Sequence, residues 1–168
     1  MITTVEGNLI EAAPSGFTVH GCNAQGVMGA GFAAQIKDKY PDSAKYYFDI
    51  CRQADSAESI LGQALMDPIR FKDMYHFGPD GMILVHGITQ NMYGRNGTRY
   101  VDYNAVRSVF ETVAEFNEKI HAWDGIYLPV RFPLIGCGLG GGNWSVVSAI
   151  IEETVPDYMT KELWLYKG

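Results

Sequence analysis

The chain has 168 residues, of which 47% are hydrophobic and 12% aromatic, and it carries a formal net charge of −6 at pH 7. This length and composition predict one globular domain over residues 1–168, with a hydrophobic core of its own. The acidic balance argues against broad nucleic-acid binding and against an anionic membrane surface. It still permits a small anionic ligand held by backbone N–H groups.

Local sequence disfavours two further classes of protein. No run of about 18 apolar residues occurs, so we expect no transmembrane helix, and the first residues do not resemble a secretory signal. The three cysteines (Cys22, Cys51 and Cys137) are scattered, without the spacing of a metal site or a disulfide framework. This pattern favours a reducing cytoplasm and predicts no bound metal.

Strands and helices alternate along the first half of the chain. We expect strands over 2–5 and 17–20, helices over 29–40 and 43–52, and strands over 61–68 and 74–77. In the first helix Phe32, Ile36 and Tyr40 recur every four residues, which is the period of a buried helix face, and Pro41 is expected to end it.

The second half continues this alternation. We expect a buried strand over 81–89, a helix over 102–120 capped by Asp102, a strand near Phe132, a helix capped by Asn143 or Ser145, and a strand over 162–166. Such an order predicts an α/β fold of three layers, with helices on both faces of a mostly parallel or mixed sheet.

The segment Phe132–Trp144 is the most distinctive part of the sequence. It holds five glycines in seven positions: Gly136, Gly138, Gly140, Gly141 and Gly142. Glycine lets the backbone approach a ligand closely, and the helix expected next supplies free N–H groups, so the segment predicts an anion site, most often a phosphate site. A tight connection without a ligand is the alternative. Three of the glycines match G-x-G-x-x-G, but only 27 residues follow Gly141. The pattern therefore predicts no NAD, and we expect no other cofactor.

A second glycine-rich loop, His20–Phe32, lies between an expected strand and the next helix. Loops at the carboxyl ends of neighbouring strands can face one crevice, and two facing anion sites suit a diphosphate. The sequence therefore predicts a nucleotide diphosphate ligand. The absence of a Walker motif argues against a metal-dependent NTPase.

Four motifs in order resemble those of a macrodomain: Gly7-Asn-Leu9, His20-Gly-Cys-Asn23, Met28-Gly-Ala-Gly-Phe-Ala33 and Ile135-Gly-Cys-Gly-Leu139. The resemblance runs from Ile2 to about Tyr166. It implies a three-layer α/β/α macrodomain with a central mixed sheet of about six strands, and a cleft for ADP-ribose. The first two motifs look like those of yeast-type ADP-ribose 1''-phosphate phosphatases. The other two look like those of terminal ADP-ribose–protein glycohydrolases.

The same resemblance assigns roles to individual residues. It implies that Asn8 and Leu9 contact the adenine and that Asn23 contacts the distal ribose. The backbone groups that it places around the diphosphate and distal ribose are those of Met28, Gly29, Ala30, Gly31, Gly136, Cys137, Gly138, Leu139 and Gly140. His20, at a strand end, is the candidate catalytic residue because a histidine can exchange protons near neutral pH. A histidine that only hydrogen-bonds the loop is the alternative.

Two departures from the glycohydrolase pattern affect the expected chemistry. Those relatives have Asp where this chain has Gly140, and a catalytic Lys where Ile88-Thr89 is followed by Gln90. Without these two groups a lysyl-adduct mechanism is disfavoured. The missing groups add weight to a reader, whereas the resemblance favours hydrolysis of ADP-ribose 1''-phosphate, which is the function that we expect. The alternatives are an ADP-ribosyl hydrolase acting on ADP-ribosylated protein or nucleic acid, and a reader that only binds ADP-ribose.

Several further residues have two interpretations each. Cys22 and Cys137 could be reactive thiolates, but small buried residues are the simpler interpretation. His76 and His86 are interpreted as core residues of strands, and His121 as an exposed residue near a helix end. The polar segment 90–100 is expected to be either a lid, with Tyr93, Arg95 or Arg99 reaching a terminal phosphate, or a solvated loop.

Overall fold

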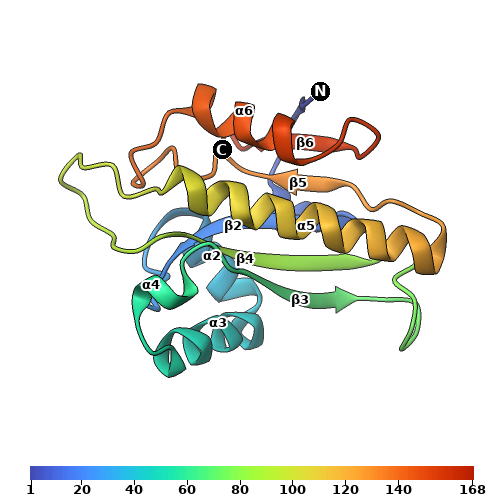
Figure 1. Ribbon diagram of the computed structural model, residues 1–168, viewed down its shortest axis with the longest axis horizontal. Coiled ribbons are helices and arrows are strands. Elements are labelled where there is room, and N and C mark those ends of the chain that lie inside the picture. The colour runs from blue at the N-terminus through green and yellow to red at the C-terminus, as the bar shows by residue number, and fades with distance from the viewer.

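A six-stranded mixed sheet forms the middle layer of the protein in a computed structural model that describes residues 1–168 (Figure 1). The strands are β1 (Thr3–Glu6), β2 (Gly16–Asn23), β3 (Ala64–Arg70), β4 (Met82–Gln90), β5 (Val130–Phe132) and β6 (Lys161–Leu165). Their order is β1-β6-β5-β2-β4-β3, and only β3 runs antiparallel to its neighbour. The predicted α/β class and the mixed six-stranded sheet are confirmed.

Helices cover both faces of this sheet (Figure 1). They are α1 (Leu9–Ala12), α2 (Gly31–Lys39), α3 (Pro41–Gln53), α4 (Ala57–Ile60), α5 (Tyr103–Asp124) and α6 (Trp144–Thr154). Helices α5 and α6 form the larger core cluster with one face of β2, β4 and β5. On the other face, α2 and α3 pack against alternate residues of β4, which include Leu84 and Ile88.

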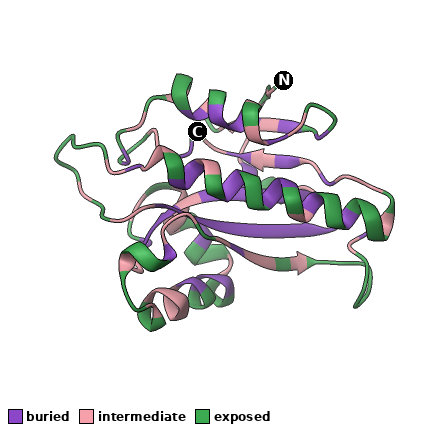
Figure 2. Cartoon of the chain, viewed as in Figure 1, coloured by how far each residue is buried: buried purple, intermediate pink, exposed green.

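The two central strands explain why both faces need cover. Every residue of β4 from Met82 to Thr89 is buried, and so are seven of the eight residues of β2 (Figure 2). Successive side chains of a strand point to opposite faces, so a strand with helices on both sides is apolar along its whole length. The continuous apolar run in the sequence therefore predicted β4 correctly.

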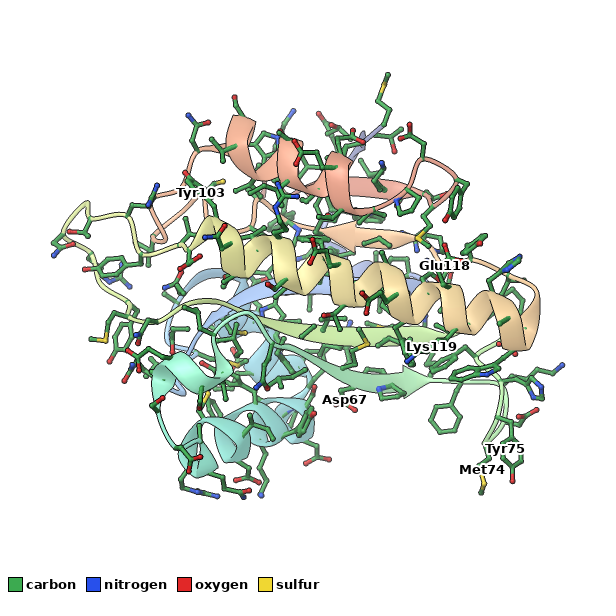
Figure 3. The ribbon with its side chains drawn as sticks, viewed as in Figure 1. Asp67, Met74, Tyr75, Tyr103, Glu118 and Lys119 are labelled. Atoms are coloured by element: carbon green, nitrogen blue, oxygen red, sulfur yellow. The ribbon has the colours of Figure 1, made fainter.

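Several expected boundaries were wrong. Residues 74–77 form a turn instead of a strand: Asp73 and His76 make an isolated bridge, and the Asp73 carboxylate accepts a hydrogen bond from the Tyr75 N–H at 2.9 Å. Met74 and Tyr75 project from the end of the molecule, 83% and 75% exposed (Figure 3). The alternation of apolar residues there reflects surface side chains, and His76 is exposed as well.

Other differences lie at helix ends. Helix α2 begins at Gly31 and ends at Lys39, and Pro41 occupies the first turn of α3, where the missing N–H of proline is tolerated. The short helices α1 and α4 were not predicted from the sequence, because four residues are too few to show a helical period. Asn143, not Ser145, caps α6. No helix combines the length and the apolar character needed to cross a lipid bilayer.

Candidate functional site

A cavity of about 500 Å³ lies at the carboxyl ends of β2 and β4, just beyond β5. Residues 29–33, where the first glycine loop enters α2, form one wall, and residues 133–136 and 138–140, with the second glycine loop, form another. The two loops therefore face one crevice, as the sequence predicted. Parallel strands deliver their carboxyl ends to one edge of a sheet, which is where such sheets bind ligands.

The wall of this cavity carries almost no charge. Of the 22 residues that line it, Arg95 is the one arginine, and none is a lysine, aspartate or glutamate. The chain as a whole has 19 acidic residues and a net charge of −6. A site without carboxylates does not repel an anion at close range, even in an acidic protein.

The second glycine loop is held tightly at both ends. Gly136 has φ of +69°, and a Cβ there would lie 2.5 Å from Val101 Cγ2, so only glycine fits without rearrangement. The Gly140 carbonyl accepts hydrogen bonds from the N–H groups of Tyr100 and Val101 at 2.8 and 3.0 Å. Gly138 differs, because a Cβ there would meet no atom within 4 Å. Its open side is part of the cavity wall.

The first glycine loop is organised around Asn23. The Asn23 Oδ1 accepts hydrogen bonds from the N–H groups of Gln25 and Val27 at 3.0 and 3.2 Å, and its Nδ2 donates to the Val27 carbonyl at 2.8 Å. The Tyr47 hydroxyl donates to the Asn23 carbonyl at 2.6 Å. Asn23 lines the cavity, but its side chain is already used in folding the loop. Its contact with a ribose stays a prediction.

His20 lies in a buried hydrogen-bonded row that joins two strands and a helix. Its Nε2 is 2.7 Å from His86 Nδ1, directly across from it on β4, and His86 Nε2 is 2.7 Å from Ser43 Oγ on α3. The His20 ring lines the cavity but is only 1% exposed. One neutral ring must donate to the other, so the two tautomers are coupled along this row.

Burial keeps both imidazoles neutral at pH 7. It lowers the pKa of His20 well below the ordinary value of 6.5, and a charge on the neighbouring His86 would lower it further. Burial also lowers the pKa of His86 to about 4, opposed in part by its hydrogen bond with Ser43. The Cys22 Sγ is 3.7 Å from His20 Nε2, and burial raises the pKa of this thiol. Cys22 is therefore a protonated thiol, in keeping with its interpretation as a small buried residue.

The same three side chains form the one group with the geometry of a metal site. His20, Cys22 and His86 offer ring nitrogens and a sulfur that all lie within 4.8 Å of one another. Imidazole and thiolate are ligands that suit Zn²⁺. Cysteine spacing alone gave no sign of this group, because His86 is 66 residues from His20. Hydrogen bonds already engage His20 Nε2 and both nitrogens of His86, through the pairing of the two rings and the contact with Ser43.

Comparison with known proteins decides the family. Residues 19–151 match the family model described as Macro domain, which is most of the chain. The chain belongs to this family. An ADP-ribose 1''-phosphate phosphatase from Meyerozyma guilliermondii is 25% identical over 160 residues, 89% of this macrodomain and 91% of that protein. A DNA ADP-ribosyl glycohydrolase from Thermus aquaticus is 25% identical over 167 residues, 99% of this chain but 41% of that protein.

Solved structures show the same fold. A protein of unknown function from Bacteroides thetaiotaomicron superposes with a TM-score of 0.78 at 23% identity, covering 99% of this macrodomain and 98% of that chain. DarTG of Thermosipho africanus, solved in complex with ADP-ribose, gives a TM-score of 0.70 at 20% identity and covers 96% and 40%. These likenesses establish a common architecture.

The macrodomain brings most of the predicted site residues together. Those that line the cavity are His20, Asn23, Gly29, Ala30, Gly31, Gly136, Gly138, Leu139 and Gly140. The Met28 side chain is buried in the smaller core cluster, and Cys137 packs partly buried against the larger one. Asn8 caps α1 through its Oδ1, which accepts from the Ile10 N–H at 3.0 Å, and Leu9 is buried. These four residues are outside the cavity wall, so the adenine contacts of Asn8 and Leu9 stay predictions.

The cavity is also lined by residues that the sequence analysis did not assign to the site, among them Phe32, which was expected on a buried helix face, Thr89 and Leu134. Thr89 Oγ1 is buried without a hydrogen-bond partner. The one signal in the sequence that could have identified Thr89 as a site residue is its position near the end of a strand, beside a glycine loop. At Gly140 a Cβ would lie 2.7 Å from the Gly136 carbonyl oxygen, so this loop conformation leaves no room for a side chain.

We expect the buried histidines to make the fold sensitive to mild acid. The unfolded chain takes up protons near pH 6.5, whereas the folded His20 and His86 do so only at lower pH. Stability present above pH 6.5 is therefore lost as the pH falls from 6.5 towards 4. The expected slope is about 1.4 kcal/mol per pH unit for each histidine. Urea denaturation at pH 7, 6 and 5 measures it.

The matched variants change one histidine at a time. His86→Gln should lower the slope of the free energy of unfolding against pH, between pH 6.5 and 5, by the contribution of one histidine. His121→Gln should leave the slope unchanged, because His121 is exposed and stacks on Tyr127. A wild-type free energy of unfolding that is flat over this range would contradict the buried, neutral state of the pair.

Proposed function

We propose that this macrodomain binds ADP-ribose and hydrolyses ADP-ribose 1''-phosphate to ADP-ribose and inorganic phosphate. One observation carries the proposal: two glycine loops at the carboxyl ends of parallel strands enclose a cavity that has no carboxylate and one arginine. Backbone N–H groups of such loops suit a diphosphate. The names of both relatives describe enzymes that act on ADP-ribose derivatives, which supports the choice of ligand.

Size supports the same choice. A cavity of about 500 Å³ is within the range of small-molecule sites. Its wall combines glycine backbone with apolar surface from Phe32, Val27 and Ile135. In this proposal the diphosphate lies between the two loops, and the distal ribose points towards His20 and the segment that follows β4.

His20 is the proposed proton acceptor. A neutral imidazole takes the proton of a water molecule as the water oxygen attacks phosphorus. The bond between phosphorus and the oxygen on C1'' then breaks, and that leaving oxygen receives the proton back from the His20 imidazolium. The low pKa of His20 keeps the ring neutral at pH 7 and therefore available to accept a proton, although it also makes the ring a weaker base. His86 and Ser43 would fix the tautomer of the ring.

We expect ADP-ribose to bind with a micromolar Kd and to raise the melting temperature. Ligand at 100 times its Kd adds about 2.7 kcal/mol of stability through linkage. AMP should bind more weakly, because it lacks the second phosphate and the distal ribose. Isothermal titration calorimetry measures both constants. No heat with millimolar ADP-ribose, in a protein shown to be folded, would rule out this use of the cavity.

Two other functions have specific support. Similarity to a DNA ADP-ribosyl glycohydrolase over 99% of the chain favours removal of ADP-ribose from a macromolecule. Gly140 and Gln90 stand against a lysyl-adduct route, because they occupy the places where the resemblance to terminal ADP-ribose–protein glycohydrolases implies Asp and Lys. Near-complete burial of His20 favours a reader without turnover. Incubation with ADP-ribose 1''-phosphate, ADP-ribosylated DNA and ADP-ribosylated protein separates the three functions. Release of phosphate, release of ADP-ribose, or binding alone identifies each one.

A further inference from the structure

Arg95 is distinguished from every other arginine by having no partner within the protein. The other five arginines are engaged through Arg52–Asp49, Arg70–Ala13 carbonyl, Arg99–Tyr103, Arg107–Glu153 and Arg131–Glu162 contacts. The exposed Arg95 side chain makes no ion pair, side-chain hydrogen bond or aromatic contact, and it lines the cavity. A guanidinium presents five N–H donors, and those of Arg95 are available to a ligand.

The segment that carries Arg95 is folded against the second glycine loop. The Tyr100 hydroxyl donates to Asn96 Oδ1 at 2.7 Å, and a Cβ on Gly94 would lie 2.3 Å from that hydroxyl. The Tyr100 N–H in turn donates to the Gly140 carbonyl. These contacts fix the backbone of the segment that carries Arg95 beside the cavity. Arg99 is held elsewhere, with its guanidinium 4.7 Å from the ring of Tyr103, which Figure 3 labels at the start of α5.

Charge indicates what Arg95 would bind. Glycine loops offer partial positive charges, which suit the singly charged phosphates of a diphosphate. A phosphate monoester carries a charge of about −1.5 to −2 at pH 7 and three acceptor oxygens. An arginine guanidinium matches such a group, because it carries a full positive charge and can donate two parallel N–H hydrogen bonds. No other side chain in the cavity wall is a permanent cation.

We propose that Arg95 recognises the terminal phosphate monoester of the ligand, so that the site prefers ADP-ribose 1''-phosphate to ADP-ribose. This proposal rests on the function proposed above and adds the residue that sets its specificity. Arg95 binds the phosphate before hydrolysis. Once the P–O bond has broken, it faces free phosphate, and ADP-ribose is left without this contact.

The test compares Arg95→Gln with Arg99→Gln, two neutralised arginines four residues apart on the same loop. Arg95→Gln should weaken affinity for ADP-ribose 1''-phosphate by about 10- to 100-fold, the usual size of a charged hydrogen bond to a phosphate. Its Kd for ADP-ribose should change less than about 3-fold. Arg95→Lys should recover part of the loss, because it restores charge without the bidentate fork. Arg99→Gln should leave both affinities close to wild type.

Calorimetric Kd values for both ligands, with kcat/KM for the phosphate ester, give distinct outcomes. An equal loss for both ligands in Arg95→Gln would place Arg95 on the diphosphate and overturn the proposal, as would no loss for either. Failure of the wild type to bind ADP-ribose would instead reject the proposed function itself. If the wild type binds but does not turn over, the Kd for ADP-ribose 1''-phosphate still tests Arg95.

Discussion

Gly138→Val should abolish ADP-ribose binding while the macrodomain stays folded. A Cβ at Gly138 meets nothing within 4 Å, and the residue has no positive φ, so a valine is tolerated by the free protein. The open space that it enters is the cavity itself. A branched side chain there takes the volume of the ligand and blocks the approach of the diphosphate to the backbone. We expect affinity to fall by roughly 100-fold or more, given the cost of overpacking a formed site.

Two variants make this result interpretable. Gly138→Ala should give an intermediate loss, because a methyl group fills less of the cavity. Gly136→Ala should lose stability together with binding, since its Cβ would lie 2.5 Å from Val101 Cγ2 at a φ of +69°. Circular dichroism and melting temperature separate the two effects. Wild-type ADP-ribose affinity in folded Gly138→Val would remove the second glycine loop from the site.

Replacement of His20 should reduce turnover far more than binding. If His20 accepts the proton of the attacking water, His20→Ala lowers kcat by roughly 10²- to 10⁴-fold. ADP-ribose affinity should change much less, because the loops supply most contacts through their backbone. His20→Gln is the cleaner variant, since its amide can still pair with His86 Nδ1, which His20→Ala leaves unpartnered in the core.

The control for this experiment is His76→Gln, which alters an exposed histidine in the 73–77 turn. Its kcat and melting temperature should match those of the wild type. Phosphate release at the wild-type rate by folded His20→Gln would exclude proton transfer by this residue. A parallel loss of binding and rate in both His20 variants would instead assign His20 a structural role in the loop.

Sequence patterns predicted much of this macrodomain because the relevant signals are local. The apolar run 81–89 is β4 because a strand covered on both faces has no polar face. The two glycine loops could be located, and their meeting at one cavity followed from parallel strand ends. The strand predicted over 74–77 was wrong, because alternating apolar residues look alike on a strand and on an exposed turn.

Other features depend on contacts between segments that are far apart in the chain. His20 was a candidate from its position, yet its pairing with His86 depends on the register of β2 against β4. That register and the cover of α3 bury both rings and lower their pKa values. From the sequence, Arg95 and Arg99 were equally good candidates for contact with a terminal phosphate. Folding places one in the cavity wall and the other against Tyr103.

Most of the order of strands and helices, the positions of the two glycine-rich loops and the likeness to macrodomains could be predicted from the sequence, since these depend on neighbouring residues and on motif spacing. The packing of distant segments sets which side chains line the cavity, which two histidines are buried together and which arginine is free. Those properties depend on burial and on partners 40 to 70 residues away, such as Ser43 to His86 and His20 to His86. Residues so far apart in the chain come into contact only when the sheet and its covering helices pack together.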